Sequence, residues 1–297
     1  MIFINYYDEI KNELVNNEIT KKVKDYSKNR SDLITYYNVG KLLFEAGKHY
    51  GEGIIKEYSK RLTNEFGTKF GITLLKRIRQ FYIVIEKGAT MSHQLSWSHY
   101  CELLPVNSID KINYYIKIIE EENLSVRELR QRIKNNEYGR LDEETKKKLK
   151  TKEQLKVSDL VKNPLQIRNT SGNNEISEKV LQKLILEDIS SFLKELGNGF
   201  CFIDNEYKIK IGDRYNYIDL LLFNYEFNCF VVIELKVSEL KKEHIGQIEF
   251  YMNYIDKNLK NINQNKTIGI IICKKENKYV IEYCSDDRII AREYELV

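Results

Sequence analysis

Apolar residues recur at intervals of three and four positions through most of residues 1–138, and this spacing is typical of amphipathic helices. The clearest stretches are "IIKEYSKRLTNEF" (54–66) and "INYYIKIIEEENLSVRELRQRI" (112–133). Pro105, the only proline in this half, falls between two such stretches, as a helix boundary should. The first half of the chain is therefore predicted to be helical nearly throughout.

One segment of this half, residues 59–87, has the pattern of a helix, a short turn with two glycines and a second helix. Thr73 is a candidate N-cap for the second helix, which carries Lys76, Arg77 and Arg79. The arrangement is similar to a helix-turn-helix, whose second helix enters a DNA groove or contacts phosphates. We expect the three cations to bind nucleic acid, and an ordinary helix pair with a basic exposed face is the alternative.

The helical pattern ends in a charged segment, residues 139–175, which contains a lysine run, Pro164 and a Ser-Gly-Asn-Asn cluster. This composition is typical of a connector that is part helix and part loop. At 297 residues the chain is long enough for two domains. We predict a helical domain over residues 1–140, a connector over 141–174 and a second domain over 175–297.

The second domain alternates between helical and strand patterns. Helical spacing is found in residues 176–199 and 238–259. Strand patterns are found in residues 200–212, 266–275 and 278–284, and in two nearly unbroken apolar runs within 217–237. The predicted order is a helix, three strands, a helix and two strands, which indicates a mixed α/β sheet domain.

The two apolar runs each contain an acid, Asp219 in the first and Glu234 in the second. If the runs pair as a hairpin whose turn is centred between Glu226 and Phe227, the two acids lie directly opposite each other. Lys236, two residues after Glu234, then points to the same face. This prediction depends on an unbulged hairpin, because a slip of one residue would put the carboxylates on opposite faces.

Two buried carboxylates that face each other repel unless a cation or a proton lies between them. Mg²⁺ suits such a pair, since it is often held by one or two carboxylates and keeps water and substrate phosphate as its other ligands. A lysine beside the ion can orient or activate a water, or stabilise charge that builds on a phosphate. The three residues predict a phosphodiester-hydrolysing site, and a hairpin with incidental acids is the alternative.

Asp219 and the triplet Glu234-Leu235-Lys236, with fourteen residues between the two acids, resemble the metal-binding signature of PD-(D/E)XK nucleases. Those nucleases have the restriction-endonuclease-like fold. The resemblance implies that Asp219, Glu234 and the backbone carbonyl of Leu235 hold the metal ion. It further implies that Glu187, on the preceding helix, holds a second ion or an outer-shell water, and that Lys236 positions or activates the attacking water.

Gln247 and Tyr251 lie four residues apart and so share a helix face. They resemble the Gln-x-x-x-Tyr pattern of one branch of the same superfamily, which implies that they orient Lys236 or the scissile phosphate. His244 lies one helical turn before Gln247 and is a candidate to approach the substrate. His99, in "SWSHY", is interpreted as a structural, hydrogen-bonding histidine.

Motifs of the YhcG-like nuclease family occur in order along nearly the whole chain. They include "YYNVGKLL", "RIRQFY", "LSWSHYCELL" and "LSVRELRQRI" in the first half, and "FLKELGNGFCFI", "YIDLLLF", "CFVVIELK" and "GQIEFYMNYID" in the second. Two stretches depart from the family pattern: Gly71-Ile72-Thr73 stands where the family often reads Gly-Phe-Ser, and Phe223-Asn224-Tyr225 where it often reads Phe-Tyr-His. The resemblance implies a Mg²⁺-dependent DNase, with Mn²⁺ as the alternative ion, and a role in genome defence or mobile-element biology.

The net charge of +4 is unevenly distributed, with +8 over residues 1–170 and −4 over residues 171–297. This asymmetry fits a polyanion-binding module joined to a metal-using carboxylate site, and ordinary surface charge is the alternative. Five cysteines without CxxC spacing argue against a disulfide framework and a structural zinc site. No apolar run approaches the roughly 20 residues of a membrane span, so a cytoplasmic protein is expected.

The expected partner is DNA, bound by a homodimer because duplex cleavage needs two cuts. A protein partner for the helical domain is an alternative. Two rival functions stay open: a non-catalytic DNA-binding or assembly subunit, and an RNA-cleaving effector that uses the same chemistry.

Overall fold

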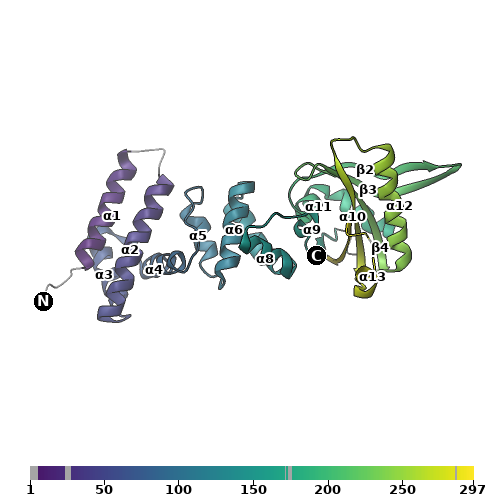
Figure 1. The fold of residues 1–297 in the computed structure, drawn as a ribbon. Helices are drawn as coiled ribbons and strands as arrows, with labels where there is room; N and C mark the ends of the chain where they lie inside the picture. The colour runs from purple at the N-terminus through teal and green to yellow at the C-terminus, as the bar shows by residue number, and fades with distance from the viewer. Residues whose placement is uncertain (1–5, 24–27, 171, 173–175, 285) are drawn as a thin grey trace. The chain divides into compact units, whose positions relative to one another are not determined.

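The computed structural model describes residues 6–23, 28–170, 172, 176–284 and 286–297 (Figure 1). The chain divides into two compact units, residues 1–138 and 139–297, and each is described by itself. Across the described residues, no helix is both long enough and apolar enough to cross a membrane.

The first unit is helical, as predicted. Its elements are α1 (Tyr6–Val23), α2 (Lys28–Tyr50), α3 (Ile54–Phe66), the 3-10 turn η1 (Thr68–Phe70), α4 (Ile72–Glu86), α5 (Trp97–Leu103), α6 (Ile109–Glu122) and α7 (Val126–Lys134), and η2 (Glu137–Arg140) spans the boundary. One apolar cluster joins α1 to α4, and a second joins α4 to α7. Gly40 permits a close approach of α2 to α4, because a Cβ there would lie 2.5 Å from the carbonyl oxygen of Ile78.

The predicted helix, turn and helix are α3, η1 and α4. The turn starts at Gly67, which has a φ of 79° that favours glycine. The prediction of Thr73 as N-cap is wrong: α4 begins at Ile72, and Gly71 in an extended conformation occupies the N-cap. Thr73 therefore lies inside the first turn of the helix.

The second unit contains a six-stranded mixed sheet with strand order β1-β6-β5-β4-β3-β2. The strands are β1 (Leu165–Ile167), β2 (Phe200–Ile211), β3 (Arg214–Asn224), β4 (Cys229–Glu239), β5 (Asn265–Lys275) and β6 (Ile289–Leu296). The helices are α8 (Glu143–Thr151), α9 (Val157–Leu160), α10 (Glu178–Glu187), α11 (Ile189–Leu196), α12 (Lys242–Asn258) and α13 (Lys278–Glu282). β3 pairs antiparallel with both β2 and β4. The pairs β4–β5, β5–β6 and β6–β1 are parallel.

Two apolar layers cover the sheet. Leu181, Leu184 and Phe192 of α10 and α11 pack on one face against alternate residues of β3, β4 and β5. Residues of α12 such as Ile248 and Met252 pack on the other face (Figure 1). β4, β5 and the second half of β3 are buried on both faces, which explains their nearly continuous apolar sequences.

Two sequence-based predictions for this unit are wrong. The single helix expected over 176–199 is two helices, because Asp188 leaves helical geometry and its carboxylate accepts a hydrogen bond from the backbone N–H of Ser191 to cap α11. The strand expected over 278–284 contains the short helix α13, none of whose residues is buried. The last strand is β6 instead, between Ile289 and Leu296.

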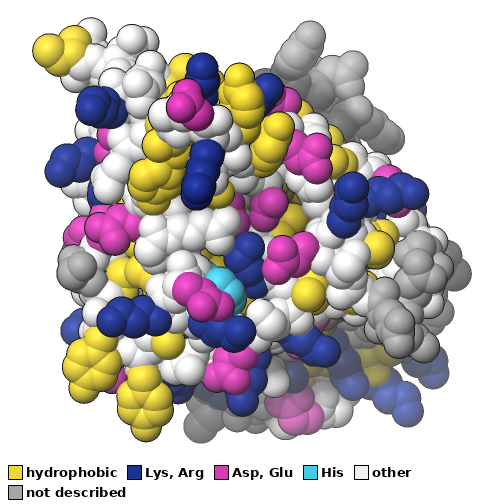
Figure 2. Space-filling model, turned by 90° about the vertical axis from the view of Figure 1, so that its right-hand side faces the viewer, with side chains coloured by type: hydrophobic (Ala, Val, Ile, Leu, Met, Phe, Trp, Pro, Cys, Tyr) yellow, Lys and Arg dark blue, Asp and Glu magenta, His cyan; other side chains and the backbone are white. Residues whose placement is uncertain are grey.

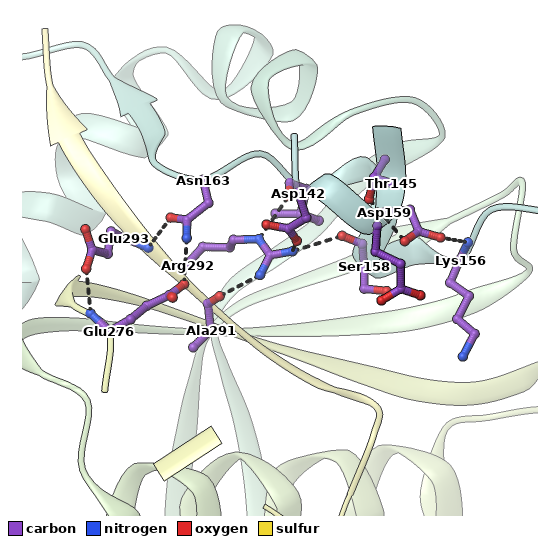
Figure 3. A network of polar contacts seen from close by, with 12 residues as sticks. Asp142, Thr145, Lys156, Ser158, Asp159, Asn163, Glu276, Ala291, Arg292 and Glu293 are labelled. Carbon is purple, nitrogen blue, oxygen red and sulfur yellow. Dashed lines mark hydrogen bonds and ion pairs between the residues drawn. The ribbon is translucent and has the colours of Figure 1, made fainter. Parts of the chain in front are cut away.

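Residues 139–170 of the charged segment belong to the second unit and are hydrogen-bonded to its strands. Arg292 of β6 donates hydrogen bonds to the carbonyl oxygens of Val161 and Ser158 and to the carboxylate of Asp142 (Figure 3). Asn163 donates to Glu276 and accepts from the backbone N–H of Glu293 (Figure 3). These bonds attach the segment to β6 and to Glu276, which follows β5.

Candidate active site

The β3–β4 hairpin has the predicted register. Leu220 pairs with Ile233, and the pairing continues residue by residue to Asn224 and Cys229. The same register extended by one residue would set Asp219 opposite Glu234, and the two acids lie close enough for the charge of Asp219 to raise the pKa of Glu234. The register predicted from the polar turn and the two apolar runs is therefore confirmed over Leu220–Asn224, and the direct opposition of the two acids stays a prediction.

Asp219 is fixed by the neighbouring backbone. Its Oδ2 accepts a hydrogen bond of 2.8 Å from the backbone N–H of Leu235. Its own carbonyl oxygen accepts a hydrogen bond of 3.0 Å from the side-chain amide of Gln182 on α10. Burial raises the pKa of Asp219, while the Leu235 N–H and the charge of Lys236 lower it. The carboxylate is thus held in place by the backbone of β4.

Glu234 is buried, with 2% of its surface exposed. Its Oε2 accepts a hydrogen bond of 3.2 Å from the Lys236 ammonium. Its Oε1 is the one buried side-chain oxygen or nitrogen among the described residues that has no hydrogen-bond partner. Burial and the nearby charge of Asp219 raise the pKa of Glu234 to about 8. An unpartnered carboxylate oxygen in such a place is costly unless a proton or a cation satisfies it.

Lys236 is the cation of the site. Its Nζ lies 3.2 Å from Oε2 of Glu234 and 3.7 Å from Oε2 of Glu178. Burial lowers the pKa of Lys236, but the carboxylates of Glu234 and Glu178 outweigh burial, so the pKa is raised overall. The side chain is therefore an ammonium at neutral pH, suited to stabilising negative charge rather than accepting a proton.

Helix α12 contributes a polar row that faces the same site. Gln247 donates a hydrogen bond of 3.2 Å to the hydroxyl of Tyr251, which is 5% exposed. Burial raises the pKa of Tyr251, the bond from Gln247 lowers it, and the charges of Glu234 and Asp219 raise it further. The structure thus brings Tyr251 within electrostatic reach of the two acids.

His244 lies in the first turn of α12 and is also buried. Its Nδ1 accepts a hydrogen bond of 3.2 Å from the backbone N–H of Lys241, and burial followed by the charge of Lys236 lowers its pKa. In the view of Figure 2, acidic, basic and histidine side chains lie next to one another around a hollow. His244 is therefore a neutral imidazole beside the lysine.

The role of Glu187 stays a prediction, and the structure places this residue away from the contact with Lys236. Nine residues of an α-helix turn through about 900°, so Glu187 projects from the opposite side of α10 to Glu178, which contacts Lys236. The carboxylate of Glu187 accepts a hydrogen bond of 2.7 Å from the Thr170 hydroxyl instead. Glu178 and Gln182, four apart on one face, are the α10 residues that reach the site. The sequence shows that these two residues share a helix face. It does not show that this face packs on the sheet.

The cations predicted to bind nucleic acid lie on α4 in the first unit. Lys76 and Arg77 are exposed. Arg79 is largely covered and donates two hydrogen bonds, of 2.7 and 2.8 Å, to the carboxylate of Glu52. Lys76 and Arg77 are thus available to a polyanion, whereas Arg79 would have to leave Glu52. Nucleic-acid binding by these residues stays a prediction.

His99 has the structural position expected for it. Its Nδ1 accepts a hydrogen bond of 3.1 Å from the backbone N–H of Ser96, and its Nε2 lies 3.0 Å from the carbonyl oxygen of Leu124. Both ring nitrogens are engaged in the cap of α5 and its contact with the start of α7. The residue is part of the helical framework.

Two family models match the chain. One, described as the DUF1016 N-terminal domain, matches residues 9–140, and the other, described as the YhcG PDDEXK nuclease domain, matches residues 158–297. The chain belongs to the YhcG-like PDDEXK nuclease family. The protein of Escherichia coli (strain K12) named "Putative nuclease YhcG" is 24% identical over 309 residues, which cover 88% of this chain and 82% of that protein.

Solved structures resemble part of this YhcG-like chain. The crystal structure of a repair endonuclease from Pyrococcus abyssi is 19% identical, covers 41% of this chain and 49% of its own, and has a TM-score of 0.30. The EndoMS-dsDNA2 complex is 18% identical, covers 43% of this chain and 48% of its own, and has a TM-score of 0.29. The YhcG-like chain therefore spans about half the length of these two structures.

The residues of the YhcG-like site fit a divalent cation. Within the described part of the chain, no three His, Cys, Asp or Glu side chains form a metal cluster by themselves. The available set is two carboxylates, from Asp219 and Glu234, with a backbone carbonyl and water. That set suits Mg²⁺, which keeps several waters, and the unpartnered Oε1 of Glu234 is the oxygen that a cation would satisfy.

The two glutamates of α10 form a matched pair for a test. Glu178→Gln is expected to lower the cleavage rate by about 10-fold, because it removes a carboxylate that orients Lys236, whereas Glu187→Gln should change the rate by less than about 2-fold. Cleavage rates of both variants at saturating Mg²⁺ provide the measurement. A larger loss for Glu187→Gln would return the third-carboxylate role to Glu187.

Proposed function

We propose that this protein is a Mg²⁺-dependent endonuclease that hydrolyses phosphodiester bonds of DNA. The observation that carries the proposal is the buried Glu234, whose Oε1 has no hydrogen-bond partner, within electrostatic reach of Asp219 and in contact with Lys236. Family membership supports nuclease chemistry of the PDDEXK type. Mn²⁺ is the alternative ion, since it also favours oxygen ligands.

Asp219 and Glu234 would hold the ion, with the Leu235 carbonyl as a further ligand. When bound, the ion supplies Lewis-acid polarisation of the phosphate and a water of lowered pKa. Lys236 stabilises the negative charge that develops on the phosphate, because its raised pKa keeps it protonated. We therefore assign Lys236 to charge stabilisation and to positioning the water, and not to proton abstraction.

The α12 residues and Glu178 support this arrangement. Tyr251 and Gln247 form a hydrogen-bonded pair that faces the acids, and they orient Lys236 or the scissile phosphate. Glu178 holds the lysine from the other side and can accept a hydrogen bond from an outer-shell water. His244, whose pKa is lowered by burial and by the charge of Lys236, is a candidate to approach the substrate.

The test compares substrates side by side. The purified protein is incubated with supercoiled plasmid, branched DNA and structured RNA in Mg²⁺, in Mn²⁺ and in EDTA. We expect nicking of DNA with either ion and none in EDTA. Equal cleavage in EDTA would contradict the metal site. Faster cleavage of RNA would favour an RNA-cleaving effector, and DNA binding in a gel shift without any cleavage would favour a non-catalytic DNA-binding or assembly subunit.

Three further points stay predictions. Each site cuts one strand, so we propose that a homodimer makes double-strand breaks. We also retain a protein partner for the helical unit as the alternative to DNA binding by Lys76 and Arg77. A role in genome defence or mobile-element biology is what the family resemblance implies.

A further inference from the structure

The hairpin of β2 and β3 extends past the rest of the sheet. β4 pairs with β3 only between Leu220 and Asn224, whereas β2 stays paired with β3 as far as Ile211 and Arg214. Residues 207–217 therefore form a two-stranded ribbon, which projects from the body of the second unit (Figure 1). A projecting ribbon costs stability unless one of its faces is covered.

The two faces of the ribbon differ in character. Ile209 is fully buried in the α12 layer, and Tyr207 and Ile211 pack against the same layer. On the other face, Lys208 pairs with Tyr217, and Lys210 pairs with Tyr215. Both lysines are exposed, and the two tyrosines are 53% and 51% exposed. The outer face is thus a solvent-facing set of alternating lysines and aromatic rings.

The lysines of this face are held in position. The ammonium of Lys208 lies 3.8 Å from the centre of the Tyr215 ring, and that of Lys210 lies 6.0 Å from the same ring. Such cation–π contacts orient a cation outward without neutralising it. Arg214 adds a third positive charge at the turn, and Asp213 is the only acid in residues 207–217. The ribbon therefore presents net positive charge.

The ribbon is continuous with the candidate active site. Tyr217 lies two residues before Asp219 on β3, which is about 7 Å at the usual rise of a strand. The whole stretch from Asp219 to Arg214 spans about 17 Å, which corresponds to about five base pairs of DNA. A duplex whose scissile phosphate reached Asp219 would thus run alongside the ribbon.

We infer that the ribbon binds duplex DNA next to the cleavage site, with Lys208 and Lys210 on phosphates and the Tyr215 and Tyr217 hydroxyls as further contacts. This inference rests on the proposed function, since it specifies how that site receives its substrate. A two-stranded ribbon has the dimensions of the major groove, and lysine and tyrosine are common phosphate ligands.

The test uses the full-length protein and a fluorescently labelled DNA duplex in EDTA, so that binding is measured without cleavage. Lys208→Gln/Lys210→Gln should weaken binding by about 10-fold near 0.1 M salt and lower the slope of log affinity against log salt by about 2. The matched control, Lys257→Gln/Lys266→Gln, removes two exposed lysines at the opposite end of the sheet. We expect the control to bind nearly as the unaltered protein does.

An unchanged salt slope in the ribbon variant, or an equal loss in the control, would overturn the inference. So would the absence of DNA binding by the unaltered protein, or a loss that appears with duplex RNA and not with duplex DNA. The outcome is separable from that of the proposed function: ribbon-dependent binding without cleavage would support the ribbon and contradict the nuclease. DNA cleavage by the unaltered protein, with the same salt slope in the ribbon variant, would support the nuclease and contradict the ribbon.

Discussion

Asp219→Asn is expected to lower metal-dependent DNA cleavage by about 10³-fold, because it removes one of two charges that hold the ion and the reacting phosphate. The fold should persist. The asparagine side-chain oxygen can still accept the hydrogen bond from the Leu235 N–H, and the Gln182 contact goes to a backbone carbonyl that the substitution leaves in place. Loss of activity would then report on chemistry and not on unfolding.

The measurement is the initial rate of plasmid nicking over a range of Mg²⁺ concentrations, with a thermal melt of each variant. Asp287→Asn is the matched control, because Asp287 is exposed and lies just before β6 at the opposite end of the sheet from the acids. The control should nick at the unaltered rate. If Asp219→Asn also nicked at that rate, the assignment of Asp219 as a metal ligand would be wrong.

The core of the site could be predicted from the sequence because a short-range rule determines it. Two apolar runs joined by a short polar turn pair in the predicted register from Leu220 to Asn224, and this register extended by one residue would set Asp219 against Glu234. Lys236 follows from the alternation of a strand. These positions depend only on the pairing of β3 with β4, so they can be predicted without knowledge of the rest of the fold.

The sequence alone does not identify the third carboxylate, because its position depends on packing between distant segments. The sequence has acids at both ends of α10, and the helical pattern alone does not say which one faces the sheet edge. Gln182, which bonds to the backbone of Asp219, fixes that orientation and brings Glu178 to Lys236. Only the contact between α10 and the hairpin reveals this.

The last strand was misplaced for a related reason. Residues 278–284 are rich in aromatic and β-branched residues, yet Tyr279 and Tyr283 are 75% and 81% exposed. β6 looked less apolar because it carries Arg292, whose burial depends on acceptors from the charged segment some 130 residues earlier. A buried arginine with remote backbone partners cannot be distinguished from a surface arginine in the sequence.

Glu234→Gln is expected to abolish cleavage and at the same time to make the metal-free protein more stable. The pKa of Glu234 rises from an ordinary 4.5 to about 8 on folding, with burial as the main cause and Asp219 as the second. An acid with a raised folded-state pKa destabilises the fold above its unfolded pKa, because the unfolded chain ionises more readily. The penalty therefore grows from about pH 4.5 to about pH 8 and is constant above that range.

Glutamine has nearly the same shape and cannot ionise, so the variant escapes this penalty. We expect a gain of about 2 kcal/mol in the free energy of unfolding at pH 8, by analogy with the replacement of buried charges, and little gain at pH 4. For a unit of this size the gain corresponds to an increase in Tm of about 4–8 °C. Thermal melts in EDTA at pH 4, 6 and 8 provide the measurement.

Glu187→Gln is the matched control, since it makes the same change at an exposed carboxylate of the same unit. Its Tm should follow that of the unaltered protein at each pH. Added Mg²⁺ should raise the Tm of the unaltered protein and of this control, but not that of Glu234→Gln, because only a protein that binds the ion is stabilised by it. A Glu234→Gln variant less stable than the unaltered protein at pH 8 would show that the buried carboxylate is already satisfied without a cation. The argument for a metal at this site would then fail.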